Sequence, residues 1–278
     1  MGNYSKQCSS ANPGLLIFMI DQSGSMSGQF FENEDKAEFA TKALNNAINQ
    51  LIERNFSEEQ PKNRCHVALI AYGSDAHLVR EGSLSELFHS PMGKSHVIKK
   101  INAGDGSILE QSRDMPYWIV SKCDGGTNMV GAFRIAQGLI EQYVAARPDT
   151  PAPVIISISD GQPNVGGGYE EVAALVRAIT QISCDDGAPL VYNAHIEKHG
   201  FNCCYPSSAQ ELPNDEHARF IFDISSQIPS AQIPAARKLG YTVEEGARGC
   251  TIGGDAVALV SLILFGSSRA LFALPVYE

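Results

Sequence analysis

The chain has 278 residues, of which 44% are hydrophobic and 19% are charged, so it can form a sizeable folded core. Its 21 Lys and Arg against 31 Asp and Glu give a net charge of −10, which argues against binding to nucleic acid or to an anionic membrane surface. The longest apolar runs, Leu15–Ile20 and Ala256–Phe265, are shorter than the ~20 residues of a membrane-spanning helix. We therefore expect no membrane and no nucleic-acid partner.

The cysteines and the N-terminus indicate a compartment. The chain holds seven cysteines without any C-x-x-C pair, and this odd number argues against a disulfide framework. The first residues contain no apolar stretch typical of a secretory signal. We therefore expect a protein of the reducing cytoplasm.

The first part of the chain alternates between predicted strands and a helix. Leu15–Ile20 is a continuous apolar run, typical of a strand that is buried on both faces of a sheet. Apolar residues at helical spacing predict an amphipathic helix from about Asp35 to Arg54. Cys65–Tyr72 is expected to form the next strand. Ala76–Glu81 follows after a loop too short for a helical crossover, so we expect it to run antiparallel at an edge.

Residues 83–122 are interpreted as an elaborated connection. Leu84–His89 is compatible with a helical turn, and Tyr117–Val120 with a short strand. The pattern of Ile108–Gln111 is ambiguous between helix and strand.

The rest of the chain continues the alternation. Helices are expected at Met129–Ala146, Tyr169–Ile182, Glu216–Gln227 and from Asp255 to about Phe265, with a further turn at Pro234–Leu239. Strands are expected at Val154–Ser159, Leu190–Ile196 and Cys250–Ile252. This order predicts an α/β fold, a doubly wound, Rossmann-like and mostly parallel sheet with one antiparallel edge strand and helices on both faces. Because no linker separates two cores, we expect an N-terminal tail over 1–12 and a single domain over 13–278.

Three predicted loops are rich in oxygen ligands. Residues 21–25 (DQSGS) follow the first strand, residues 125–128 (GGTN) precede a helix, and residues 160–161 (DG) follow the strand Val154–Ser159. In an open α/β sheet, ligands bind beyond the carboxyl ends of the strands, where the strand order reverses. We therefore expect the three loops to meet at that edge.

The side chains of these loops are typical of a hard-cation site. They provide two carboxylates and three hydroxyl groups, from Asp21, Asp160, Ser23, Ser25 and Thr127. Such oxygen ligands favour Mg²⁺, or Mn²⁺ or Ca²⁺, over Zn²⁺. Hydroxyl ligands are neutral and Mg²⁺ keeps open positions, so an Asp or Glu of a protein partner can complete the metal shell despite the net charge of −10.

The motif D-x-S-x-S, followed by the threonine and then by an aspartate at the end of an apolar strand, resembles the von Willebrand factor type A (vWA) domain over residues 13–265. In that family the set forms the metal-ion-dependent adhesion site, and all five positions are filled here. The resemblance implies that Ser23 and Ser25 are direct ligands, and that Thr127 binds directly or through water. It also implies that Asp21 and Asp160 hold metal-bound waters and orient the serines.

The resemblance also implies a setting. The chain is similar to intracellular bacterial stand-alone members, including those of tellurite-resistance systems, also in its segments 218–226 and 247–249. Such members are associated with protein kinases, phosphatases or AAA+ ATPases. By this analogy we expect an interaction module of bacterial signalling, stress response or complex assembly, and no enzyme.

Three alternatives remain open at this point. Mg²⁺ with carboxylates can also hydrolyse phosphate esters, although the three motifs contain no Lys, Arg or His that could act on a leaving group. The site can be silent in a scaffold protein. Zn²⁺ is a further possibility at one cluster, whose spacing matches no standard zinc finger: His195, His199, Cys203 and Cys204.

Overall fold

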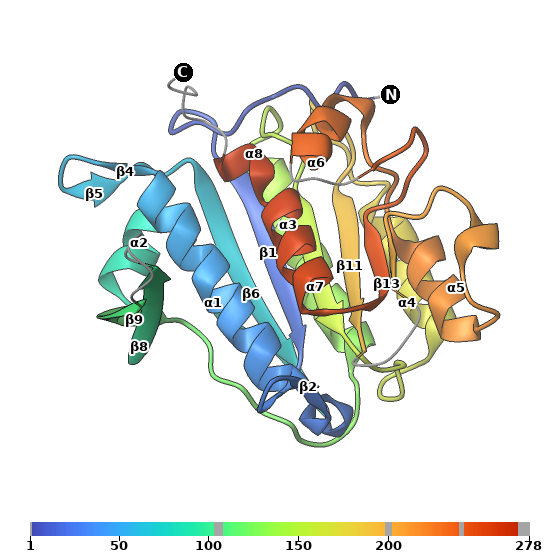
Figure 1. The fold of residues 1–278 in the computed structure, drawn as a ribbon. Coiled ribbons are helices and arrows are strands. Elements are labelled where there is room, and N and C mark those ends of the chain that lie inside the picture. The colour runs from blue at the N-terminus through green and yellow to red at the C-terminus, as the bar shows by residue number, and fades with distance from the viewer. Residues whose placement is uncertain (1, 103–107, 198–201, 239–241, 272–278) are drawn as a thin grey trace.

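The computed structural model describes residues 2–102, 108–197, 202–238 and 242–271. Its centre is a seven-stranded sheet with the strand order β12-β13-β11-β10-β1-β6-β7 (Figure 1). In chain order these strands are β1 (Gly14–Asp21), β6 (Cys65–Tyr72), β7 (Ala76–Ser83), β10 (Val154–Ser159), β11 (Leu190–Ile196), β12 (Cys203–Cys204) and β13 (Cys250–Gly254). The strands from β13 to β6 pair in parallel, and β7 runs antiparallel at one edge, as the short loop predicts. The two-residue β12 adds an antiparallel pair at the other edge.

Helices cover both faces of this sheet. On one face lie α1 (Lys36–Arg54), α7 (Ala256–Gly266) and α8 (Ser268–Leu271), and on the other α3 (Met129–Ala146), α4 (Tyr169–Ile179) and α5 (Glu216–Ile224). All eight residues of β1 are buried, because successive side chains enter the two opposite cores. Leu16 and Phe18 belong to the α1 side, whereas Ile17 and Met19 belong to the α3 side. The doubly wound, mostly parallel α/β fold is confirmed.

Several predicted boundaries shift by a few residues. The helices α4 and α5 end three residues earlier than predicted, and β13 continues to Gly254. At the end of α5, the Ser225 hydroxyl donates to the carbonyl of Ile221 at 2.6 Å while its backbone becomes extended, which ends the helix. The turn predicted near Pro234 is the short helix α6 (Ile233–Lys238), and Leu239 lies outside the described residues.

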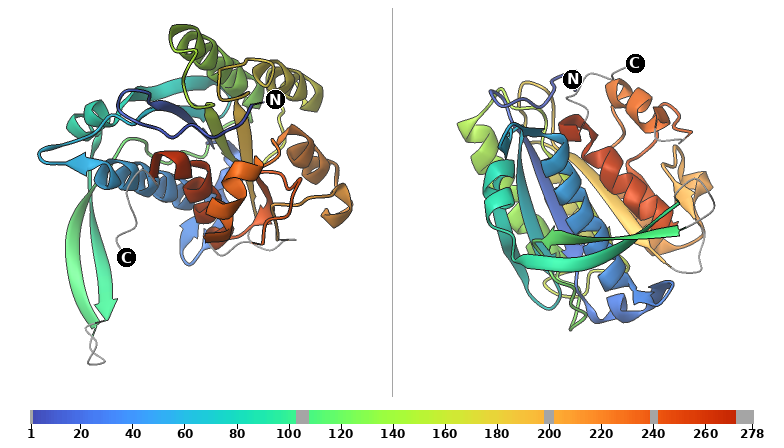
Figure 2. Two further views of the ribbon diagram at one scale, coloured as in Figure 1. Left: turned by 90° about the horizontal axis from the view of Figure 1, so that it is seen from above. Right: turned by 60° about the vertical axis from the view of Figure 1, so that its left-hand side comes forward.

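The connection over 83–122 differs most from the expectation. It contains the predicted turn as α2 (Leu84–His89), followed by a long hairpin of β8 (Gly93–Asn102) and β9 (Ile108–Tyr117). This hairpin projects away from the rest of the molecule (Figure 2). The short strand expected at 117–120 is wrong, because Tyr117 ends β9 and Trp118 turns into the core. There the Trp118 indole N–H donates to the carbonyl of Leu87 at 2.8 Å.

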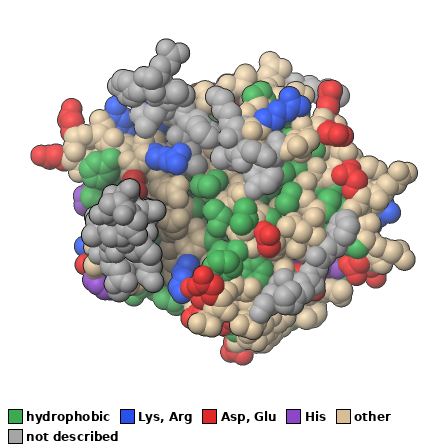
Figure 3. All heavy atoms as spheres, in the orientation of Figure 1, with side chains coloured by type: hydrophobic (Ala, Val, Ile, Leu, Met, Phe, Trp, Pro, Cys, Tyr) green, Lys and Arg blue, Asp and Glu red, His purple; other side chains and the backbone are tan. Residues whose placement is uncertain are grey.

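Smaller elements complete the fold. Two short hairpins pair β2 (Gln29–Phe31) with β3 (Glu34–Asp35) and β4 (Phe56–Ser57) with β5 (Gln60–Pro61). Single 3₁₀ turns occur at Gly24–Ser27, Ala209–Glu211 and Ser230–Gln232. In the part of the chain that the structure describes, every helix is too short or too polar to cross a bilayer. On the face drawn in Figure 3, hydrophobic side chains lie over the region of α1 and α7, with acidic side chains around them.

Candidate metal centre

The three oxygen-rich loops lie at the carboxyl edge of the parallel sheet. The strand β1 stands between β10 and β6, so the chain changes direction across the sheet at the β1–β10 pair. Asp21 is the last residue of β1, and Asp160 follows the last residue of β10. Both therefore lie at the crevice where α/β sheets bind ligands.

Oxygen atoms from the first and second loops surround one point beside the third. A Cβ atom added to Gly161 would stand 3.2 Å from Ser25 Oγ, 3.3 Å from Thr127 Oγ1 and 3.7 Å from Asp21 Oδ2. Ser23 Oγ lies 3.0 Å from Ser25 Oγ, and Ser25 Oγ donates to Asp160 Oδ1 at 2.7 Å. The five residues singled out in the sequence are thus neighbours in space, although up to 139 positions separate them in the chain.

Backbone contacts fix the loops relative to one another. The N–H of Gly24 in the first loop donates to the carbonyl of Gly125 in the second at 3.0 Å. Gly125 has a φ of +71°, a conformation that favours glycine. The N–H of Thr127 donates to Asn164 Oδ1 at 2.7 Å, which ties the second loop to the chain beyond the third. The hydroxyl groups therefore stand on a preorganised frame.

Asp21 is the most buried acid of the site. Its Oδ1 accepts a hydrogen bond from the backbone N–H of Ser23 at 2.8 Å, and its Oδ2 accepts one from the Ser159 hydroxyl at 2.6 Å. Burial raises the pKa of Asp21 to about 6, and these hydrogen bonds limit the rise. A carboxylate held in this way can orient the serine loop that follows it.

Asp160 carries an ion pair that the sequence analysis did not anticipate. Its Oδ2 lies 2.5 Å from Lys36 Nζ, and their side chains are 1% and 16% exposed. Lys36 is the first residue of α1, which begins there because the Asp35 side chain accepts a hydrogen bond from the Glu38 N–H. The cap of Asp35 is a recognisable signal for the start of this helix. No pattern in the sequence connects Lys36 with a residue 124 positions away.

The residues present fit a divalent cation with hard oxygen ligands. Ser23, Ser25 and Thr127 bring three hydroxyl oxygens to one place, and among the described residues none forms a hydrogen bond with Thr127 Oγ1. The two carboxylates and the Lys36 ammonium give the immediate site a net charge of −1. This donor set suits Mg²⁺, Mn²⁺ or Ca²⁺ better than Zn²⁺, which favours nitrogen and sulfur.

The alternative zinc cluster finds no support in the described residues. His195 Nδ1 accepts a hydrogen bond from the Gly253 N–H at 3.1 Å, and the Cys204 thiol donates to Asn202 Oδ1 at 3.4 Å. Within those residues no three His, Cys, Asp or Glu side chains are grouped closely enough to hold a metal ion. His199 lies outside the described residues.

The chain is similar in overall fold to solved structures from several organisms. The conserved hypothetical protein BatB from Bacteroides thetaiotaomicron has 14% sequence identity and a TM-score of 0.48, with 92% of this chain and 98% of that chain covered. The minor pilin PilB from Streptococcus sanguinis has 10% identity, a TM-score of 0.49, and coverage of 93% and 61%. The manganese-loaded TRAP protein from Plasmodium vivax has 14% identity, a TM-score of 0.41, and coverage of 87% and 71%.

The sequence shows which family the chain belongs to. A search among curated proteins found no match. The sequence model of the von Willebrand factor type A domain matches residues 16–162, a range that includes all five residues of the candidate site. The chain therefore belongs to the von Willebrand factor type A domain family.

Proposed function

We propose that this protein is a metal-dependent protein-interaction module with a complete metal-ion-dependent adhesion site. Ser23, Ser25 and Thr127 would bind Mg²⁺, or Mn²⁺ or Ca²⁺, while Asp21 and Asp160 hold waters around the ion. An Asp or Glu side chain of the partner completes the metal shell. The observation that carries the proposal is the meeting of Ser25 Oγ, Thr127 Oγ1 and Asp21 Oδ2 around one point beside Gly161.

The residues of the chain prepare this site in two ways. The Ser25 hydroxyl donates a hydrogen bond to Asp160, so its proton points away and a lone pair of its oxygen is available to a cation. Lys36 neutralises one of the two carboxylates, so a bound divalent cation would change the local charge from −1 to +1. A site with this net charge attracts an acidic side chain even on a protein whose total charge is −10.

The cellular setting is proposed by analogy. The segments 218–226 and 247–249 resemble those of bacterial stand-alone members of the tellurite-resistance type, which would act in signalling, stress response or complex assembly. We propose a kinase, phosphatase or AAA+ ATPase system as the partner and the cytoplasm as the location. The seven cysteines, all unpaired, support a reducing compartment.

Calorimetric titration of Mg²⁺ and Mn²⁺ into the purified protein tests the proposal. Wild type should bind the metal saturably, whereas Asp21→Ala and Asp160→Ala should show no binding at millimolar metal while remaining folded. Ser27→Ala is the matched control, because the Ser27 hydroxyl in the same loop donates to the Gly24 carbonyl and is no candidate ligand. A wild-type protein that binds neither metal would instead be a scaffold with a silent site.

A partner should depend on the same metal. Capture of a protein from the native lysate is expected in Mg²⁺ and should be lost in EDTA and in Asp21→Ala. Capture that persists unchanged in EDTA contradicts the proposed role of the metal.

One observation favours a second candidate, a metal-dependent phosphoester hydrolase. Lys36 brings an ammonium group to 2.5 Å from Asp160, where the sequence motifs alone offered no cation for a leaving group. Turnover of a generic phosphoester with Mg²⁺ or Mn²⁺, lost specifically in Ser23→Ala, would support this candidate. The absence of turnover under conditions where the metal binds would exclude it.

A further inference from the structure

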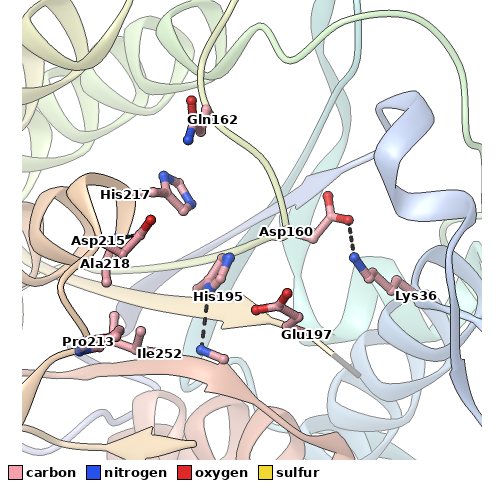
Figure 4. A pocket seen from close by; sticks show the side chains of 11 residues that line it. Lys36, Asp160, Gln162, His195, Glu197, Pro213, Asp215, His217, Ala218 and Ile252 are labelled. Carbon is pink, nitrogen blue, oxygen red and sulfur yellow. Dashed lines mark hydrogen bonds and ion pairs between the residues drawn. The ribbon is translucent and has the colours of Figure 1, made fainter. Parts of the chain in front are cut away.

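A pocket of about 360 Å³ adjoins the candidate metal centre and shares two of its residues (Figure 4). Lys36 and Asp160 form its wall on the metal side. The remaining lining comes from the ends of β11 and β13, the start of α5, and the loop residues Gln162 and Pro213. Ligand sites usually measure 300–1,000 Å³, so this pocket has the size for a single side chain of a partner. A residue near the acid that completes the metal shell would lie close to it.

The polar lining of the pocket contains a buried group without a partner. His217 is 5% exposed, and its Nε2 atom has no hydrogen-bond partner among the described residues. Its Nδ1 atom lies 3.3 Å from the Tyr169 hydroxyl, and its ring stands against that of His195 with centroids 4.8 Å apart. An unsatisfied buried nitrogen costs free energy, so it points to a ligand group that would complete its hydrogen bonding.

The charges around the pocket favour a cationic ligand. Lys36 and Asp160 neutralise each other, and the remaining charged groups of the lining are the carboxylates of Glu197 and Asp215. Among the described residues neither carboxylate forms an ion pair. One oxygen of Asp215 accepts the Ala218 N–H at 2.7 Å, which leaves the other oxygen available.

The rest of the lining narrows the choice of cation. Ile252, Pro213 and Ala218 form an apolar part of the wall, which suits a side chain with a long hydrocarbon stem. Burial lowers the pKa of His217 to about 4, so its ring stays neutral beside a cation and one nitrogen keeps its lone pair. In the tautomer whose Nδ1–H donates to the Tyr169 hydroxyl, the Nε2 atom of His217 accepts a hydrogen bond. A guanidinium group, with five donors in a planar fork, can reach this acceptor and a carboxylate together.

We propose that this pocket binds an arginine side chain of the same partner whose Asp or Glu completes the metal shell. The link between the arginine and the metal rests on the proposed function. The affinity of the pocket for a guanidinium group does not, because it needs no metal. The partner is thus expected to present a basic residue beside an acidic one.

Titration of N-acetyl-arginine amide, followed by the imidazole NMR signals of His195 and His217, tests the pocket directly. Both signals should shift, and the neutral isostere N-acetyl-citrulline amide should bind about ten-fold more weakly because it lacks the charge. The double variant Glu197→Gln/Asp215→Asn should lose a similar factor. Asparagine caps a helix as well as aspartate does, so α5 should remain folded. Glu141→Gln, which removes an exposed carboxylate from α3 at a distance from the pocket, is the control and should bind like wild type.

Binding measurements with and without Mg²⁺ distinguish the arginine pocket from the proposed metal-dependent function. The arginine probe should bind in EDTA, because the pocket needs no metal, and the positive charge of bound Mg²⁺ nearby should weaken its binding rather than be required for it. A second experiment uses peptides in which zero to three glycines separate one aspartate from one arginine. In Mg²⁺, at least one of these peptides should bind at least about ten-fold more tightly than the same peptide with citrulline in place of arginine. Equal binding of arginine and citrulline in both experiments would overturn the inference. Binding of the arginine probe, together with peptide binding that is the same in Mg²⁺ and in EDTA, would support the pocket and contradict the proposed function.

Discussion

The two ends of the parallel sheet each bury an acid that is paired with a cation, and they hold it differently. At the amino end, Asp186 accepts hydrogen bonds from the N–H groups of Lys6 and Ala152 and pairs with Arg269. At the carboxyl end, Asp160 accepts its hydrogen bonds from a serine hydroxyl and from Lys36. Both acid side chains are 1% exposed. The two carboxylates are therefore equally buried, but backbone N–H groups and an arginine hold Asp186, whereas a hydroxyl group and a lysine hold Asp160.

The kind of donor decides what each acid can do. Backbone N–H groups and a guanidinium can only donate, so Asp186 is held in one arrangement that joins the N-terminal segment, the β10 start and α8. A hydroxyl group can also accept or bind a metal, and a lysine is flexible. The amino end is therefore a structural clamp, and the carboxyl end keeps groups that can change partners.

The largest effect is expected from breaking the clamp. Asp186→Ala leaves Arg269, which is 7% exposed, without its carboxylate, and should lower the free energy of unfolding by about 3–5 kcal/mol. Denaturant unfolding measures this loss. Asp185→Ala is the control, because its side chain is 64% exposed and should change stability by less than about 1 kcal/mol. Equal losses in both variants would contradict the structural role of Asp186.

The two ends should also respond differently to acid. Burial lowers the pKa of His217, at the carboxyl end, to about 4 from an ordinary value near 6.5, so between these values the unfolded chain binds the extra proton. From this group alone, the free energy of unfolding should therefore fall by at most about 3 kcal/mol as the pH drops from about 6.5 to 4, whereas the raised pKa of Asp21 acts in the opposite direction over much of this range. At the amino end, hydrogen bonds from Ala152 and Lys6 and the charge of Arg269 lower the pKa of Asp186 despite its burial. The contribution of Asp186 to the free energy of unfolding is therefore lost only when the pH falls below the ordinary pKa of an aspartate.

Comparison of wild type with His217→Gln isolates this effect. As the pH drops from 6.5 to 4, the free energy of unfolding of the variant should rise relative to that of wild type by up to about 3 kcal/mol, as measured by denaturant unfolding at several pH values. The exposed His77 provides the control, and His77→Gln should keep the wild-type pH dependence. An unchanged slope in His217→Gln would contradict the neutral state of His217.

Lys36 tests whether the carboxyl end can exchange one cation for another. Without metal, Lys36→Met leaves Asp160 without its counter-ion and should lower the free energy of unfolding by about 1.5–3 kcal/mol. Removal of a nearby positive charge should at the same time raise the affinity for Mg²⁺. Thermal unfolding in EDTA and in Mg²⁺ should therefore show a larger stabilisation by Mg²⁺ in the variant than in wild type. Lys42→Met, which removes an exposed lysine of the same helix, should show the wild-type response.

The smallest effect is expected at Gly161. In Gly161→Ala the new methyl group would stand 3.2 Å from Ser25 Oγ and 3.3 Å from Thr127 Oγ1, so these oxygens must move apart by a few tenths of an ångström. We expect a several-fold loss of Mg²⁺ affinity by calorimetry, with a change of less than about 1 kcal/mol in unfolding free energy. Gly138→Ala on α3, where no atom lies within 4 Å of the new methyl, is the control. Unchanged affinity would mean that the metal does not bind at this point.

The sequence by itself determined the sheet and the residues of the candidate site, because both depend on local patterns. Strands buried on two faces need continuous apolar runs such as Leu15–Ile20, and helices need the apolar period seen from Asp35 to Arg54. The motif residues follow these runs directly, and parallel strands bring their carboxyl ends to one edge. The meeting of the three loops was predictable for this reason.

Only the tertiary structure decided the β8–β9 hairpin, the Lys36–Asp160 pair and the pocket with His217. The hairpin stands apart from the sheet, so it lacks the apolar alternation that marks a half-buried strand, and even Val97 is 43% exposed. The ion pair and the pocket join residues far apart in the chain, whose contacts leave no periodic signal. They follow from how the helices pack over the carboxyl edge, and packing is a property of the folded molecule.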